Sequence, residues 1–409
     1  MKKSLSIIAV LALATACIYP YQPDMDAAPE GVLVVDGSLM IGEMSTVRIG
    51  FMNSLWPDKN NDQYYPGGGG GGYMYAIGDM SPVRVWAEDE TGAVYEVVPS
   101  TTEWGYSPLT PFKIPTENAP ADRNYRVCVS VNGQQYSSDW IKPLAPPIIK
   151  SISFKAPNNS QDVTVQVSLD SGADATGYML LSFDEAWRFH TDYYPNYQYD
   201  PASNSVSLRV FSWDRYWCWK TVDPGTQIPI DYTEMAGSGV KDYPLHRFSR
   251  YDNRNHQRYS ILVKARTIDK ATYKFLSHLE ELSQSGDNLF SPNPGEIPGN
   301  LRCETDPERM VMGYVTIAIT SSKRAYNGSQ FLLTRLPSPY ALSYPLQWPR
   351  IPGEPAWREF YDMGYMPLVE NTLPPVEGQE MGPYGWGWDS CYDCIAAGGT
   401  QTRPDFWED

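Results

Sequence analysis

Apolar and polar residues alternate along much of the first third of the chain. Alternation puts every second side chain on one face of a β-strand, and it is clear over residues 47–51 and 125–131. The second of these stretches runs into Asn132-Gly133, a dipeptide that favours a tight hairpin turn. Short strands separated by turn residues in this way predict a β-sandwich over residues 32–145.

The same alternation returns beyond this region, for example over residues 163–169. A different pattern follows at 269–285, where Asp269 precedes apolar residues spaced for one face of a helix. From residue 337 onward prolines and tryptophans dominate and no periodicity holds. We therefore expect residues 146–409 to form a larger β-rich domain with one packed helix and a C-terminal segment that wraps over it. The fold class is mainly β.

Composition agrees with many short strands joined by turns. The 409 residues include 35 Pro and 32 Gly, too many breakers for a helical protein, and 13% are aromatic, too many for a disordered one. The formal net charge is −16, which would repel the phosphates of DNA or RNA. Nucleic acid is therefore not an expected partner.

The N-terminus has the features of a bacterial lipoprotein signal. Lys2 and Lys3 precede an apolar run over 5–14, and small residues then lead to Cys17. The apolar run is shorter than the roughly 20 residues needed to span a bilayer. We expect residues 1–16 to be removed and Cys17 to be diacylated. The alternative is a simple secreted protein in which Cys17 has no special role.

Residues 17–31 contain three prolines and no periodic apolar pattern, which is typical of an extended tether. Several acyl chains on one cysteine anchor a protein stably to a membrane. Asp24 and Asp26 lie where some lipoproteins carry an acidic export signal. We therefore expect a lipid-anchored protein of the outer membrane, at the cell surface rather than on the periplasmic face.

Five further cysteines would lie in an oxidising compartment. The Cys391-x-x-Cys394 pair has three interpretations, namely a redox motif, half of a zinc site, or structural disulfides that fix the C-terminal segment. Neither the strand–helix setting of a redox motif nor a second pair of zinc ligands accompanies it, so structural disulfides are favoured. The connectivity stays open. The possible disulfide cysteines are Cys128, Cys218, Cys303, Cys391 and Cys394.

No catalytic constellation stands out. The histidines at 190, 246, 256 and 278 are scattered, and neither a zinc-protease helix motif nor a nucleophile elbow is present. We therefore expect no enzymatic activity, no cofactor and no metal site.

Two aromatic clusters are the remaining functional signal. Exposed rings with a polar rim bind sugars, peptides or partner proteins, whereas buried rings only fill a core. In strand geometry the three tryptophans of the second cluster would share one face. The possible binding residues are Tyr193, Tyr194, Tyr197, Tyr199, Trp213, Trp217 and Trp219.

Several segments in a fixed order resemble a known family. They are WDRYWCWKT at 213–221, NLFSPNP at 288–294, PGNL at 298–301, VMGYV at 311–315 and CYDCIAAGGTQTRPDFW at 391–407. This order is similar to the Bacteroidota lipoproteins grouped as domain of unknown function 4249. The resemblance implies an outer-membrane lipoprotein, often encoded beside a TonB-dependent receptor, with an immunoglobulin-like N-terminal region. The family supplies no catalytic residues.

These observations lead to three functional hypotheses, of which a secreted hydrolase has the least support because no catalytic constellation is found. The first is a lipid-anchored outer-membrane accessory binding protein that works with a TonB-dependent receptor in nutrient uptake and takes a glycan or peptide ligand. The second is a structural or adhesive surface lipoprotein with no small-molecule ligand.

Overall fold

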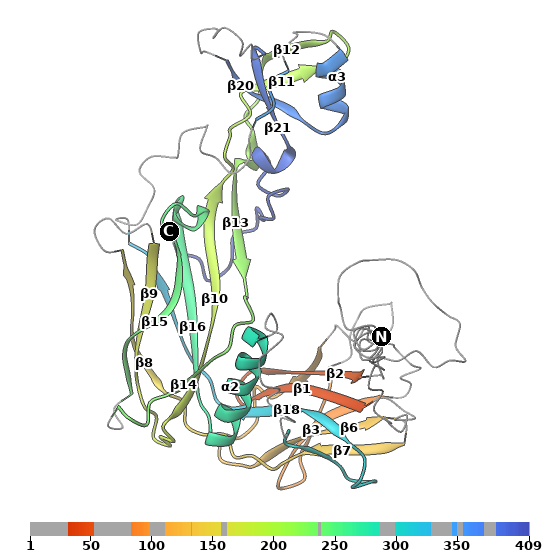
Figure 1. Cartoon of the computed structure of the whole chain (residues 1–409), viewed down its shortest axis with the longest axis vertical. Helices are drawn as coiled ribbons and strands as arrows, with labels where there is room; N and C mark the ends of the chain where they lie inside the picture. Colours follow the sequence, from red (N-terminus) through yellow and green to blue (C-terminus); the bar gives the residue numbers. More distant parts are fainter. Residues whose placement is uncertain are drawn as a thin grey trace, which may run out of the picture.

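The computed structural model describes residues 32–52, 83–98, 111–131, 133–156, 162–235, 239–285, 299–328, 346–349, 355–371 and 382–408. The expected signal peptide, Cys17 and the tether lie outside these residues. The fold is mainly β, as predicted, and is built from two sandwiches and a smaller head at one end of the long axis (Figure 1).

The first sandwich consists of two sheets. One has the strand order β18-β1-β2-β5, with β1 at Val32–Met40, β2 at Met44–Met52, β5 at Phe112–Pro115 and β18 at Val311–Ala318. The other has the order β17-β7-β6-β3-β4, with β3 at Arg84–Asp89, β4 at Val94–Glu96, β6 at Tyr125–Val131, β7 at Gln134–Ser138 and β17 at Leu301–Cys303. Alternate residues of both sheets fill the core between them.

Tyr125 is the first residue of β6, and it ties the start of this strand to the loop before it. Its side chain is fully buried, and its hydroxyl donates to the backbone carbonyl of Pro120. A tyrosine near a strand start that bonds a few residues upstream is a feature of immunoglobulin-like sandwiches. As the alternation over 125–131 predicts, every second side chain of β6 faces the core, namely Val127, Val129 and Val131 after Tyr125.

β17 and β18 correct the predicted boundary at residue 145. The sequence pattern predicts that everything after that residue belongs to the second domain, but β18 pairs in parallel with β1, and β17 pairs with β7. The physical reason is that β1 and β7 would otherwise leave open sheet edges. Alternation along the sequence predicts where a strand lies, but not which strands it pairs with.

Two segments quoted for the family resemblance fix this pairing. The side chain of Asn300 accepts from the backbone N–H of Val315 and donates to its carbonyl, both at 2.8 Å. Gly313 lies opposite Val35 with φ +110°, and a Cβ there would lie 1.9 Å from the Val35 carbonyl oxygen. Only glycine allows this close approach of two backbones.

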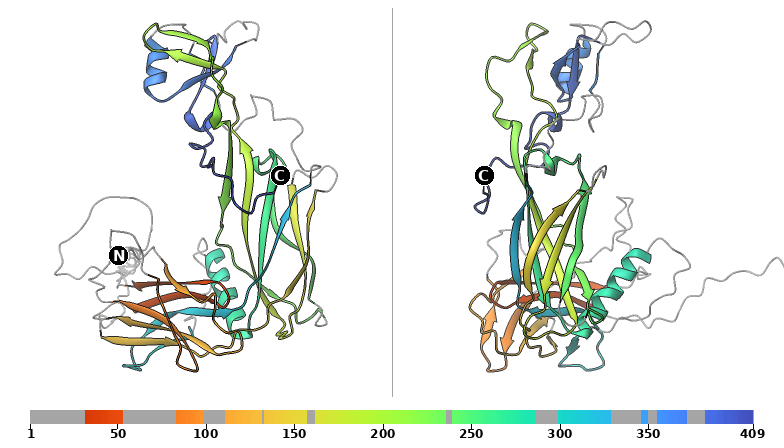
Figure 2. Two further views of the ribbon diagram at one scale, coloured as in Figure 1. Left: turned by 180° about the vertical axis from the view of Figure 1, so that it is seen from behind. Right: turned by 90° about the vertical axis from the view of Figure 1, so that its left-hand side faces the viewer.

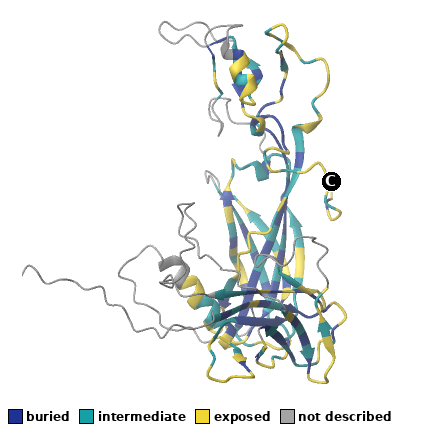
Figure 3. Ribbon diagram, turned by 90° about the vertical axis from the view of Figure 1, so that its right-hand side faces the viewer, coloured by how far each residue is buried: buried dark blue, intermediate teal, exposed yellow. Residues whose placement is uncertain are grey.

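The second sandwich packs the sheet β15-β9-β8 against the sheet β13-β10-β16-β19, with β14 also paired to β10. Their bounds are Ile148–Lys155 for β8, Asp162–Asp170 for β9, Tyr178–His190 for β10, Trp217–Val222 for β13, Ile228–Asp231 for β14, Val240–Ser249 for β15, Arg258–Thr267 for β16 and Ser321–Tyr326 for β19. The buried side chains of the two sheets form one core. In Figure 3 the buried residues follow the strands of both sheets.

The predicted helix is confirmed as α2, Lys270–Ser285. Asp269 is its N-cap, since the carboxylate accepts from the backbone N–H of Thr272 at 2.7 Å. Phe275 stacks on Tyr314 of β18, and Tyr273 packs on Tyr178 of β10. The helix therefore contacts both sandwiches. Among the described residues, no helix has the length and apolar character needed to cross a bilayer.

The head was not predicted as a separate unit. It contains the hairpin β11 (Tyr197–Asp200) and β12 (Ser205–Leu208), a second helix α3 (Pro355–Asp362), and the hairpin β20 (Met366–Glu370) and β21 (Tyr384–Gly387). β10 and β13 lead from the second sandwich toward it (Figures 1 and 2). Much of the expected C-terminal wrap is therefore head, and only the last part returns along the second sandwich.

Candidate functional site

The C-terminal segment, residues 388–408, is attached to the second sandwich by a disulfide and by backbone pairing. Cys218 on β13 is bonded to Cys394, and Trp219 exchanges backbone hydrogen bonds with Thr400 at 2.8 and 2.7 Å. Further on, Trp407 packs edge-on against Tyr326 of β19. The segment thus passes around the edge of β13 and reaches the outer face of the sheet.

The other three candidate disulfide cysteines are free thiols. Cys128 alternates with the core residues of β6 and faces outward, whereas Cys303 packs into the core, so the two cannot meet. Cys391 is buried among Tyr193, Leu368 and Tyr392. Burial raises the pKa of Cys128 to about 12 and that of Cys391 to about 11. These thiols are therefore poor nucleophiles.

The four tyrosines of the first cluster lie along the chain that enters the head. Tyr193 and Tyr199 are buried, the latter against Trp386 and Tyr361. The hydroxyl of Tyr197 donates to Glu370 at 2.9 Å, which joins β11 to β20. Tyr194 is the most exposed, and its hydroxyl accepts from the backbone N–H of Trp213 at 2.8 Å. Most of this cluster therefore builds the head.

The three tryptophans do not share one face, which corrects the strand interpretation. A 3-10 turn at Asp214–Tyr216 precedes β13, so Trp213 lies outside the strand. Its indole N–H donates to the carbonyl of Tyr392 at 2.8 Å and holds the C-terminal segment. Trp217 and Trp219 lie in β13 and do share a face, because they alternate with buried Cys218.

Arg188 lies directly beside these two tryptophans. In the β10–β13 register it faces Trp219, and its guanidinium carbon is 5.0 Å from the Trp219 ring centroid and 5.1 Å from that of Trp217. Because Trp187 and Phe189 on either side of Arg188 belong to the core, Arg188 points outward. In the β10–β16 register the residue opposite Arg188 is Arg258, which lies over the ring of Tyr326 at 4.4 Å. We call Arg188, Arg258, Trp217 and Trp219 the arginine face.

Two histidines that are far apart in sequence lie at the end of this face. The ring of His190 stacks on that of His256, with centroids 4.3 Å apart. The ring of Tyr216 also stacks on His190, with centroids 5.0 Å apart. Burial lowers the pKa of His190. Burial and the neighbouring His190 lower the pKa of His256 to about 4. Both imidazoles are therefore neutral at pH 7.

An exposed apolar segment runs from the last residue of β12, in the head, toward β13. Leu208 is 66% exposed, and Val210 and Phe211 are each 81% exposed. We call these three residues the apolar neck. Side chains of this kind are commonly buried, and a cluster of them in solvent marks a contact surface. The sequence does not predict this contact surface, because an apolar run alone does not show whether another part of the chain covers it.

A depression of about 600 Å³ lies between α2 and the first sandwich. Its wall includes Trp140, 42% exposed, together with Phe275, Lys274 and His278. Its other polar groups serve the fold, since Asp269 caps α2 and Asn300 holds Val315. No sequence signal pointed to this depression, because its lining comes from four separated segments.

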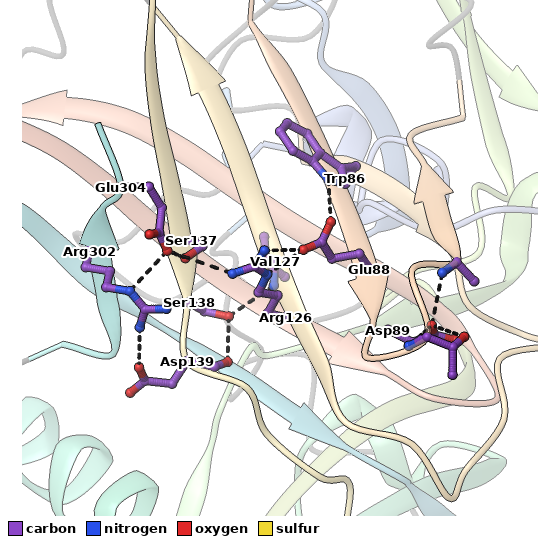
Figure 4. A network of polar contacts seen from close by, with 12 residues as sticks. Trp86, Glu88, Asp89, Arg126, Val127, Ser137, Ser138, Asp139, Arg302 and Glu304 are labelled. Carbon is purple, nitrogen blue, oxygen red and sulfur yellow. Dashed lines mark hydrogen bonds and ion pairs between the residues drawn. The ribbon is translucent and has the colours of Figure 1, made fainter. Parts of the chain in front are cut away.

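The outer face of the β17-β7-β6-β3-β4 sheet carries a charged network (Figure 4). Arg126 pairs with Glu88, while Arg302 of β17 bonds Glu304 at 3.0 Å and Asp139 at 2.9 Å. Ser137 also donates to Glu304. Every charge in this network has an opposite partner, so the network holds β17 to its sheet and leaves no group free for a ligand.

A second charged cluster is internal. Glu185 accepts from Arg254 Nε and from the Tyr259 hydroxyl, both at 2.8 Å, and His246 Nε2 lies 3.2 Å away. It lies within the second sandwich core and is not a surface site. Among the described residues, no group of three or more His, Cys, Asp and Glu side chains is placed to hold a metal.

The fold and these surfaces define a β-rich protein with two sandwiches and a head. The chain belongs to the family described as domain of unknown function (DUF4249), which matches residues 18–324. The segment quoted from 391–407 lies beyond the matched residues. No curated protein matches the chain.

Two solved structures have low similarity to the chain. Trypsin-activated alpha-2-macroglobulin from Escherichia coli is 11% identical with a TM-score of 0.18, over 60% of this chain and 15% of that one. The N-terminal four immunoglobulin domains of Dscam1 isoform 4.44 are 11% identical with a TM-score of 0.15, over 73% of this chain and 61% of that one. The chain thus spans less than two thirds of either structure, and similarity at this level carries no functional argument.

Proposed function

We propose that this protein is a lipid-anchored outer-membrane accessory protein that binds a TonB-dependent receptor and assists nutrient uptake. The anchor is Cys17, and the surface that contacts the receptor is the apolar neck. The exposure of Leu208, Val210 and Phe211 is the observation that supports this proposal best. Large apolar side chains on a chain of net charge −16 favour a protein partner that covers them.

The position of the neck suits such a contact. β1 begins at Val32 in the first sandwich, whereas the neck and head lie at the opposite end of the long axis (Figure 1). A lipid on Cys17 would hold the chain through the first sandwich and leave the neck and head free to engage a neighbouring protein. The N-terminal lipoprotein pattern and the family resemblance support this arrangement.

A pull-down from detergent-solubilised outer membrane tests the proposal. We expect the wild-type protein to co-purify with a receptor β-barrel, and the V210S/F211S variant to lose it. The matched control is V94S/M310S, which changes two residues that are also exposed but lie in and near the first sandwich. Recovery of no receptor, or equal recovery with both variants, would contradict the proposal and favour the adhesive alternative.

The anchor is tested separately by metabolic labelling with a radioactive fatty acid. We expect the wild-type protein to incorporate label and C17S to incorporate none and to leave the membrane fraction. Protease treatment of intact cells then measures surface exposure, since only a surface protein is cleaved before the cells are lysed.

A further inference from the structure

The depression between α2 and the first sandwich has the size of a small-molecule site. Its volume of about 600 Å³ falls within the range of roughly 300–1,000 Å³ that such sites occupy. Its lining comes from the residues around Trp140, from α2, from Gly299 and from β18. The depression is therefore a hollow that the first sandwich and the helix packed on it build together.

Trp140 is an exposed side chain of this lining that is held in place. The residue is 42% exposed, although aromatic rings of this size are commonly buried. The guanidinium carbon of Arg126 lies 4.6 Å from the centroid of the Trp140 ring, and Arg126 is itself paired with Glu88. The indole N–H has no acceptor among the described residues. Trp140 thus offers a fixed ring and a free donor to a ligand.

The helix α2 presents two further groups to the same depression. Lys274 and His278 are four positions apart, so they lie on one face of the helix, and both are exposed. Neither forms an ion pair or a hydrogen bond within the described part of the chain. Other residues fix the helix here, because Phe275 stacks on Tyr314 and the Tyr314 hydroxyl lies 3.0 Å from that of Thr272. The fold therefore does not need the ammonium or the imidazole.

The depression also contains hydrogen-bond acceptors. Asp139 accepts from Arg302 at 2.9 Å, and Asp269 accepts from the backbone N–H of Thr272 at 2.7 Å, each through one carboxylate oxygen. The second oxygen of each carboxylate has no partner among the residues that the structure describes, and it can still accept. Together with Lys274, the lining carries two acidic groups and one basic group. Its charge therefore disfavours an anionic ligand.

From this combination we propose that the depression binds a neutral saccharide, with Trp140 as the surface on which a sugar ring stacks. The C–H face of a sugar ring is apolar and can pack on an aromatic ring, whereas its hydroxyls both donate and accept hydrogen bonds. The donors of Lys274 and His278 and the acceptors of Asp139 and Asp269 match such hydroxyls. A purely apolar ligand would leave these groups unpaired, which costs affinity. A saccharide here is the nutrient of the proposed function, on which the proposal rests for its biological setting.

Saturation-transfer NMR on the purified protein tests this site, because it detects weak binding and identifies the ligand protons in contact. The probes are the neutral oligosaccharides cellotriose, maltotriose, xylotriose, mannotriose and chitotriose. Trigalacturonate, which is anionic, and the peptide trialanine are the comparison ligands. We expect at least one neutral oligosaccharide to bind, with the strongest transfer to the C–H protons of one ring face. If none binds, or if a comparison ligand binds more tightly than all of them, the proposal is wrong.

Substitutions of Trp140 locate the binding site. W140A should weaken binding of the oligosaccharide about tenfold, and W140F should weaken it less because it keeps a ring and loses only the indole N–H. The matched control is W388A, because Trp388 is similarly exposed, at 47%, but lies in the C-terminal segment. W388A should leave the affinity unchanged. No loss in W140A, or equal losses in W140A and W388A, would overturn the site.

A substitution of Lys274 separates binding from folding. K274A should weaken binding about threefold to tenfold through the loss of a hydrogen bond, without a change in melting temperature. The matched control is K241A, which removes another exposed lysine, in β15, and should change neither quantity. A lower melting temperature with unchanged affinity in K274A would assign Lys274 to the fold and contradict its role in the site.

The two proposals can fail independently, because the depression lies beside the first sandwich and the neck lies toward the other end of the long axis (Figure 1). W140A should still recover the receptor in the pull-down, and V210S/F211S should still bind the oligosaccharide. Receptor recovery without saccharide binding would refute the saccharide site alone. Saccharide binding without receptor recovery would refute the receptor contact alone.

Discussion

Cys218 in β13 and Cys394 in the C-terminal segment are joined by a disulfide across 176 positions of the chain. Between these two residues lie parts of both sandwiches and the part of the head formed by α3, β20 and β21. The bond therefore closes a long loop, and the backbone pairing of Trp219 with Thr400 continues the attachment beyond it.

Reducing this disulfide should destabilise the second sandwich. Closing a long loop lowers the entropy of the unfolded chain, and removing a native disulfide costs about 2–5 kcal/mol. We expect the double variant C218A/C394A to show a loss of this size in urea denaturation. C391A is the matched control, because Cys391 is equally buried but unpaired. A reductant should lower the stability of C391A and leave C218A/C394A unchanged.

Gly313 should be intolerant of any side chain. A Cβ there would meet the Val35 carbonyl at 1.9 Å, and φ is +110°. G313A should therefore separate β18 from β1 and cost more than about 3 kcal/mol. G92A is the control, since Gly92 also has positive φ but nothing lies within 4 Å of its Cβ position, and about 1–2 kcal/mol is expected. Chemical denaturation measures both losses. Equal losses in the two variants would show that the positive φ accounts for the whole cost and that the close contact with the Val35 carbonyl adds nothing.

Strand positions were predictable because alternation is a local property. Residues 125–131 and 163–169 form strands as expected, and Asp269 begins the helix. Pairing is not local, so the assignment of β18 to the first sandwich did not follow from its own residues. Gly313 and Asn300 explain that pairing only once Val35 and Val315 are seen beside them.

The candidate site was predictable only in part, for the same reason. The tryptophans of 213–219 are conspicuous in sequence, but the 3-10 turn at Asp214–Tyr216 removes Trp213 from the strand. Arg188 and Arg258 are seventy positions apart in the sequence, yet they are directly opposite each other on the paired strands β10 and β16. A sequence pattern holds no information on such a cross-strand pair, and the exposure of Phe211 depends equally on what lies beside it.

Glu185 should be essential for the stability of the second sandwich. Burial alone would raise the pKa of this carboxyl, but hydrogen bonds from His246 and Arg254 outweigh burial and lower the pKa to about 2. E185Q would leave Arg254 with Asp252, at 2.9 Å, as its remaining carboxylate partner among the described residues, and should cost about 3 kcal/mol, the lower end of the range for breaking a buried ion pair. D184N is the control, since Asp184 forms only an outward-facing pair with Lys264 and its loss should cost under about 1 kcal/mol.

The pH dependence of this contribution has a definite sign. The folded pKa of Glu185 lies below its ordinary value of 4.5, so the unfolded chain binds more protons in this range. The stabilisation is complete above about pH 4.5 and is lost as the pH falls toward about 2. The free energy of unfolding should therefore differ less between wild type and E185Q at pH 3 than at pH 6. A constant difference across this range would contradict the assignment.

The stacked pair His190 and His256 should make the protein less stable in mild acid. The pKa of His256 falls from 6.5 to about 4 because burial and the nearby His190 oppose its protonation. In the unfolded chain His256 would bind its proton near pH 6.5, so stability is lost as the pH drops from 6.5 toward 4, by about 3 kcal/mol. H256F should remove most of this slope, whereas H278F, on the α2 surface depression, should keep it. Denaturation at successive pH values measures the slope, and an unchanged slope in H256F would contradict this origin.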